Sequence, residues 1–126
     1  MAISGEDFAL VAGCTRMSTG YEILSRNQSK LFHLTGGTVL AAAGCNSDIL
    51  TMQRFLSARL TQYEHAHGKE MSTSAAAQLL CTTLYSRRFF PYYAFCMLAG
   101  KRTFGKLGKF CHLYYLAHIR FLYFMN

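Results

Sequence analysis

The sequence lacks the features that mark secreted, disulfide-bonded and membrane-spanning proteins. Its five cysteines have no short paired spacing, which favours free buried thiols over a disulfide framework. The N-terminal segment lacks the basic start and apolar core of a secretory signal. The apolar run at 110–125 is shorter than the roughly 20 residues that a bilayer requires and contains Arg120, so no spanning helix is expected. These absences predict a protein of the cytoplasm and nucleus, where thiols stay reduced.

Acidic residues are absent from the last 26 positions. Residues 1–100 carry eight basic and six acidic side chains, whereas residues 101–126 carry five basic ones and no acid. Most of the net charge of +7 therefore belongs to the C-terminal segment and says little about the remainder. Because aromatic residues accompany the basic ones and no recognition motif is present, we expect no nucleic-acid partner.

The first forty residues are typical of strands. The run Phe8–Gly13 is almost continuously apolar, as in strands covered on both faces, and a turn at 4–7 precedes it. Apolar segments at 31–34 and 38–43 flank Thr35-Gly36-Gly37, which predicts a hairpin because glycines accept positive φ. A strand, not a helix, follows these glycines, so they do not indicate a nucleotide site.

The period changes to that of a helix at Asn46 or Ser47, either of which can cap it, and the helix is predicted to end near Gly68. Its C-terminal end carries His65 and His67. As metal ligands these would need two more donors, and no donors are suggested nearby, so we predict no metal site. The expected apolar stripe consists of Ile49, Met52, Leu56, Leu60 and Tyr63.

A second helix is predicted from Ser72 or Thr73 to Arg88, because small residues and leucines recur at helical spacing over 74–84. The single proline, Pro91, disfavours the α conformation at Phe90, and the aromatic residues that follow favour a strand over 92–99. The chain therefore turns from helix into strand here. The order of strands, two helices and a strand predicts an α+β fold with the helices on one face of a sheet.

Four segments carry a family resemblance. They are Ala2–Phe8, Thr15–Ser18, Ser57–Leu60 and Leu84–Tyr93. These segments are similar to the first hairpin, the next turn, the first long helix and the helix-to-strand junction of proteasome beta subunits, in particular the non-catalytic type-1 branch of the 20S core. The likeness ends at Gly100. We therefore predict a partial beta-subunit domain over 1–100 and a divergent basic and aromatic tail over 101–126.

The resemblance implies an αββα sandwich of the N-terminal-nucleophile hydrolase type, of which this chain holds about the first half. It implies a structural place in the seven-membered beta ring, with other alpha and beta subunits as partners and no cofactor. Active family members use a freed N-terminal Thr as the nucleophile of a threonine protease. Here the chain opens Met1-Ala2-Ile3 within the expected first strand, so we expect that Thr to be absent and the chain not to be an enzyme.

The remaining catalytic positions also depart from the family pattern. Cys14 stands where the family has an acidic residue before Thr-Arg, and Lys30 aligns only loosely with the family's lysine. We considered Cys14 as a nucleophile paired with a histidine, but a small residue on a buried strand is more often packing. No catalytic, cofactor-binding or metal-binding residue is predicted, and an active threonine or cysteine hydrolase remains the least favoured hypothesis.

The tail has two alternative interpretations. Residues 101–109 are basic and broken by glycines, and 110–125 could form an interfacial membrane helix, although we expect no membrane partner. The favoured interpretation is an altered reading frame, a retained intron or an alternative last exon, since the family likeness stops abruptly. Under that interpretation the chain is a truncated form, which either joins the ring or does not assemble. The stripe of the alternative helix would consist of Phe110, Leu113, Ala117, Phe121 and Phe124.

Overall fold

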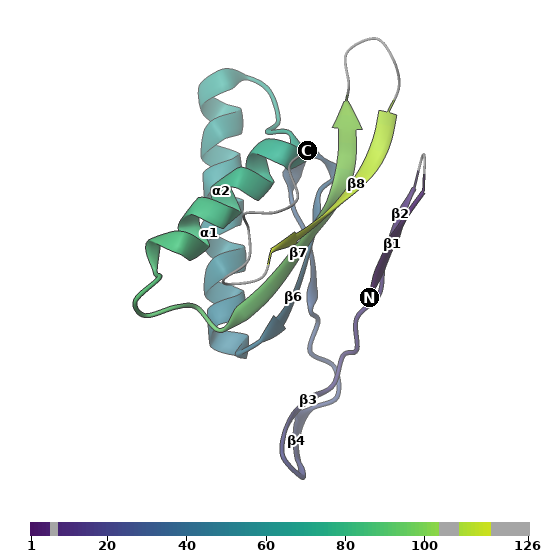
Figure 1. The fold of residues 1–126 in the computed structure, drawn as a ribbon, viewed down its shortest axis with the longest axis vertical. Coiled ribbons are helices and arrows are strands. Elements are labelled where there is room, and N and C mark those ends of the chain that lie inside the picture. Colours follow the sequence, from purple (N-terminus) through teal and green to yellow (C-terminus); the bar gives the residue numbers. More distant parts are fainter. Residues whose placement is uncertain (6–7, 104–108, 117–126) are drawn as a thin grey trace.

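The computed structural model describes residues 1–5, 8–103 and 109–116, with side chains as far as Gly100. Two small hairpins come first, followed by the main sheet and two helices (Figure 1). The elements are β1 (Ala2–Ser4), β2 (Ala9–Val11), β3 (Met17–Thr19), β4 (Glu22–Ser25), β5 (Leu31–His33), a 3-10 turn η1 (Thr35–Gly37), β6 (Val39–Gly44), α1 (Asn46–His67), α2 (Thr73–Ser86), β7 (Ala94–Thr103) and β8 (Lys109–Leu116).

The main sheet is antiparallel, in the order β5-β6-β7-β8. Both helices cover one of its faces, and the β1–β2 hairpin lies on the opposite side, in contact with β7 and β8 (Figure 1). The β3–β4 hairpin extends away from the sheet. The predicted α+β arrangement, with helices on one face, is therefore confirmed.

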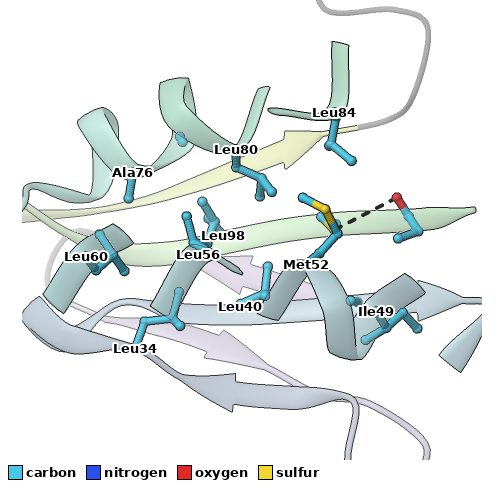
Figure 2. Close-up of a cluster of buried hydrophobic side chains, with 14 residues drawn as sticks. Leu34, Leu40, Ile49, Met52, Leu56, Leu60, Ala76, Leu80, Leu84 and Leu98 are labelled. Carbon is cyan, nitrogen blue, oxygen red and sulfur yellow. Dashed lines mark hydrogen bonds between the residues drawn. The ribbon is translucent and has the colours of Figure 1, made fainter. Parts of the chain in front are cut away.

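The buried core lies between the helices and the sheet. The register pairs Leu40 on β6 with Leu98 on β7, and both side chains are fully buried. Four of the five predicted stripe residues of α1 are buried against them, and Tyr63 is half-buried at the end of the stripe. Small side chains of α2, such as Ala76 and Ala77, let this helix pack close to the sheet. Figure 2 shows this cluster.

The helix boundaries lie within two residues of the predicted ones, with α2 ending at Ser86 and not at the predicted Arg88, but one predicted cap is wrong. Ser72 caps α2 by accepting a hydrogen bond from the backbone N–H of Ala75 (3.3 Å), and Gly68 is the C-cap of α1. The predicted cap of α1 at Asn46 or Ser47 is wrong, because the N-cap is Cys45 and no side chain caps this end. Asp48, in the first turn, instead accepts a hydrogen bond from the backbone N–H of Tyr93 (2.9 Å).

Three further expectations need correction. The segment Thr15–Ser18, predicted as a turn, already enters β3 at Met17. The run Phe8–Gly13 forms only the short strand β2, whose Leu10 is exposed, so its two faces are not covered within the described residues. The helix considered for 110–125 is wrong over 110–116, which belong to β8, and residues 117–126 lie outside the described part.

Strand β7 continues through Thr103, past the Gly100 boundary, and pairs with β8. The division of the chain at residue 100 therefore does not coincide with an end of the sheet. Among the described residues, neither helix combines the length and the apolar character that crossing a bilayer would require.

Candidate functional site

The sheet has an apolar face that the helices do not cover. Because side chains alternate along a strand, the residues between the core positions of β6 and β7 point to the opposite side. The register pairs Ala41 with Met97 and Ala43 with Phe95 there, and all four are half-buried or exposed. We call these four residues the outer sheet face. The β1–β2 hairpin touches β7 and β8 but leaves its own Ile3, Phe8 and Leu10 exposed.

An exposed apolar surface of this kind is typical of a protein interface. Removal of apolar surface from water contributes roughly 25 cal/mol per Å², and the entropy lost on association opposes this gain. The sequence predicts the strand over 92–99 but not the exposure of one of its faces, because the run 94–99 is apolar at every position. The outer sheet face is thus the first candidate for a functional surface.

The helix-to-strand junction forms a second exposed surface. Residues 87–93, which we call the arginine–aromatic loop, connect α2 to β7, and Phe89 and Phe90 are 96% and 87% exposed. The sequence pointed to this segment as a corner, not as a surface. The available signal was that Arg-Arg-Phe-Phe-Pro has neither helical nor alternating periodicity. A segment without either period presents no apolar face to the core, so its two phenylalanines are not expected to be buried.

Cys14 and Lys30 lie in a small hydrogen-bonded region at the start of the β3–β4 hairpin. Lys30 Nζ donates to the backbone carbonyl of Arg16 (2.8 Å), and the N–H of Arg16 donates to Cys14 Sγ (3.4 Å). The hydroxyl of Thr15 donates to the carbonyl of Arg26 (3.0 Å). The hydrogen bonds of Cys14 within the described residues include no histidine. This arrangement ties three chain segments together through backbone groups, which is a structural role.

The remaining residues singled out in the sequence occupy turn and helix-end positions. His65 and His67 are exposed, and His67 stacks on Tyr63 with ring centroids 4.2 Å apart while its Nδ1 lies 3.0 Å from the Tyr63 carbonyl. Within the described residues, no three His, Cys, Asp or Glu side chains gather in a way that could hold a metal. Gly36 and Gly37 form the turn before β6, both at positive φ.

The cysteines among residues 1–100 are free, as predicted, but they differ in environment. Cys14 and Cys45 are exposed, so the expectation that they are buried is wrong. Burial within β7 raises the pKa of the Cys96 thiol to about 11 from its ordinary 9.0. Burial also raises the pKa of Cys81, on α2.

We expect thiol alkylation to separate these cysteines. With a pKa of about 11, only about one in a thousand Cys96 thiols is ionised at pH 8, and burial also blocks access. Iodoacetamide followed by peptide mapping should therefore modify Cys14 and Cys45 readily while Cys96 stays unmodified. Equal alkylation rates for Cys14 and Cys96 at pH 8 would contradict the buried position of Cys96 on β7.

The same pKa gives a sign for the pH dependence of stability. The folded state favours the neutral thiol of Cys96, because its pKa is raised above the ordinary value of 9.0. The stabilisation that the neutral Cys96 thiol contributes to the folded state is fully present below pH 9. It is lost as the pH rises toward 11, because the thiol of the unfolded chain ionises at a lower pH than that of the folded chain. We therefore expect ionisation of Cys96 to lower the free energy of unfolding as the pH rises from 9 to 11.

Comparison with known proteins places this sequence in a family. The family model described as "Proteasome subunit" matches residues 1–116, which extends beyond Gly100. The chain is 50% identical over 106 residues to proteasome subunit beta type-1 of Drosophila melanogaster, an alignment that covers 84% of the chain and 45% of the relative. The corresponding proteins of Arabidopsis thaliana and Danio rerio are 49% and 47% identical over the same length, with 48% and 45% of the relatives covered.

The chain thus spans slightly less than half the length of the curated relatives it matches. Its strands and two helices are consistent with part of the N-terminal-nucleophile hydrolase fold that the family resemblance implies. Because the family match extends over nearly all of its residues, the chain belongs to the proteasome subunit family.

Proposed function

We propose that this chain acts as part of a non-catalytic beta type-1 subunit of the 20S proteasome core. In this role it occupies a place in the beta ring, in the cytoplasm and nucleus, and contacts neighbouring alpha and beta subunits. The assembled particle degrades intracellular proteins, including those marked with ubiquitin. The observation that carries the proposal is the likeness to the Drosophila, Arabidopsis and Danio relatives, each of which is named proteasome subunit beta type-1.

The distribution of apolar residues supports a structural role in an assembly. The outer sheet face and the β1–β2 hairpin expose apolar side chains on the side away from the helices. Surfaces of this kind are stabilised when a partner or a further layer of the same fold covers them. By contrast, the ammonium group of Lys30 is engaged by a backbone carbonyl, which supports structure and not nucleophile activation.

The proposal can be tested by fractionating a native extract by size and searching each fraction by mass spectrometry for peptides from 101–126. We expect these peptides to elute with the intact core particle. Finding them only in small or aggregated fractions, while the core is intact, would favour the alternative that the chain does not assemble. An activity-based probe for N-terminal nucleophiles, added to the same fractions, should label catalytic beta subunits and leave this chain unlabelled.

A further inference from the structure

The arginine–aromatic loop presents adjacent aromatic side chains to solvent. Phe89 and Phe90 are nearly fully exposed, and Tyr85 on the last turn of α2 and Pro91 are exposed beside them. Single exposed apolar residues are common on protein surfaces, but two neighbouring phenylalanines at a projecting corner form a concentrated apolar patch. Neither phenylalanine belongs to the buried core, so the core does not account for their aromatic character.

The loop is held in one conformation by backbone hydrogen bonds at its first end. The N–H groups of Arg87 and Arg88 donate to the carbonyls of Leu84 (3.3 Å) and Tyr85 (3.0 Å), continuing the last turn of α2. The N–H of Phe90 then donates to the carbonyl of Arg87 (3.1 Å). These three bonds fix the backbone on both sides of Phe89.

The second end of the loop is tied to the start of α1. The backbone N–H of Tyr93 donates to Asp48 Oδ2 (2.9 Å), and its carbonyl accepts from the N–H of Cys45 (2.8 Å). Hydrogen bonds therefore hold both ends of the loop, one at the end of α2 and the other at the start of α1. Phe89 and Phe90 are thus already positioned at the surface before a partner binds. A preorganised segment loses less entropy on binding, which favours its use as an anchor.

The positive charges of Arg87 and Arg88 in this loop favour a binding partner that carries a carboxylate. The guanidinium of Arg88 lies 5.9 Å from the ring centre of Tyr85 and 6.0 Å from that of Phe89, and that of Arg87 lies 5.9 Å from Tyr92. The sequence holds no Asp or Glu after Glu70, and Asp48, at the base of the loop, already accepts from Tyr93. A carboxylate from outside this chain would complete the hydrogen-bonding capacity of these arginines.

We propose that the arginine–aromatic loop is an anchor that inserts Phe89 and Phe90 into an apolar pocket with an acidic rim on a neighbouring proteasome subunit. This inference rests on the proposed function and specifies one contact through which it operates. A protein partner fits better than RNA, because aromatic residues and arginine are the residue types enriched at protein hot spots, and residues 1–100 carry little net charge. RNA capture is a separate outcome of the test.

The test uses the tagged 126-residue chain expressed in cells that contain the proteasome. The double variant Phe89→Ser/Phe90→Ser should lower the fraction of chain that sediments with the core particle by at least about tenfold, as expected for central interface aromatics. The matched control is Tyr21→Ser, since Tyr21 is a fully exposed aromatic at the turn of the β3–β4 hairpin. This control should sediment as the original chain does. Unchanged amide exchange in α1 verifies that the double variant is folded.

A second measurement reads the contact directly. A photo-crosslinking amino acid at position 89 should capture a proteasome subunit, and the same group at position 21 should not. Equal sedimentation of the double variant, or crosslinks from position 89 only to RNA or to nothing, would overturn the inference while leaving the proposed function intact. Absence of the original chain from the core would contradict the proposed function, and the crosslink would still decide whether the loop contacts a subunit.

Discussion

Replacement of Leu98 by alanine is expected to lower the free energy of unfolding by about 2–5 kcal/mol, the range for a buried leucine whose cavity does not collapse. Leu98 is 0% exposed and lies opposite Leu40 in the register of β6 and β7. It belongs to the same buried cluster as Leu56 of α1 and Leu80 of α2 (Figure 2). Its truncation therefore weakens the contact of both helices with the sheet.

Amide hydrogen exchange of β6 and β7, followed by mass spectrometry, measures this effect without requiring a monomeric two-state transition. We expect protection in Leu98→Ala to fall by about 30-fold or more, which corresponds to the lower end of that range. Leu24→Ala is the matched control, because Leu24 on β4 is 55% exposed and surface changes usually stay within about 0.5 kcal/mol. Equal protection in the two variants would contradict the assignment of Leu98 to the core.

The helices could be predicted from sequence because their signals are local. The stripe from Ile49 to Leu60 has the period of a helix, and Ser72 and Gly68 are common cap residues. The prediction of the α1 cap failed for a tertiary reason. Asp48 reaches across to the backbone of Tyr93, 45 positions away, and this contact, not a local cap, accompanies the start of the helix.

The sheet was harder to predict because its stability depends on distant pairing. Pro91 and the aromatic residues after it predict a strand over 92–99, but they do not show that β7 continues to Thr103 or that Lys109–Leu116 pairs with it. The aromatic residues of 110–116 suit either an amphipathic helix or a strand, and pairing with β7 decides between the two. Short strands such as Met17–Thr19 carry too few residues to show a period at all.

The candidate surfaces were only partly predictable. The sequence located the helix-to-strand junction through Pro91 and the family resemblance, yet exposure of Phe89 and Phe90 requires knowledge of where the core lies. Likewise, Lys30 was identified only as a loose family match. The structure assigns it a specific partner, the carbonyl of Arg16, which no sequence pattern indicates.

Replacement of Gly44 by alanine is expected to destabilise the chain by about 3 kcal/mol or more, by combining backbone strain with a steric clash. Gly44 has φ of 126°, a conformation that residues with a side chain rarely adopt. A Cβ atom here would collide with the backbone carbonyl of Tyr93. That carbonyl accepts the hydrogen bond from the N–H of Cys45, so the clash would also weaken this hydrogen bond between the start of α1 and the arginine–aromatic loop.

Gly68→Ala separates the two causes, because Gly68 also has positive φ (64°) but no atom lies within 4 Å of its added Cβ. It should show only the strain of a left-handed alanine, about 1–2 kcal/mol. Amide exchange at Cys45 and Tyr93 should accelerate in Gly44→Ala and stay unchanged in Gly68→Ala, since only the former displaces the Tyr93 carbonyl. If both variants lost the same stability with no local acceleration, the close approach of Gly44 to Tyr93 would not constrain the loop, and its preorganisation would need another source.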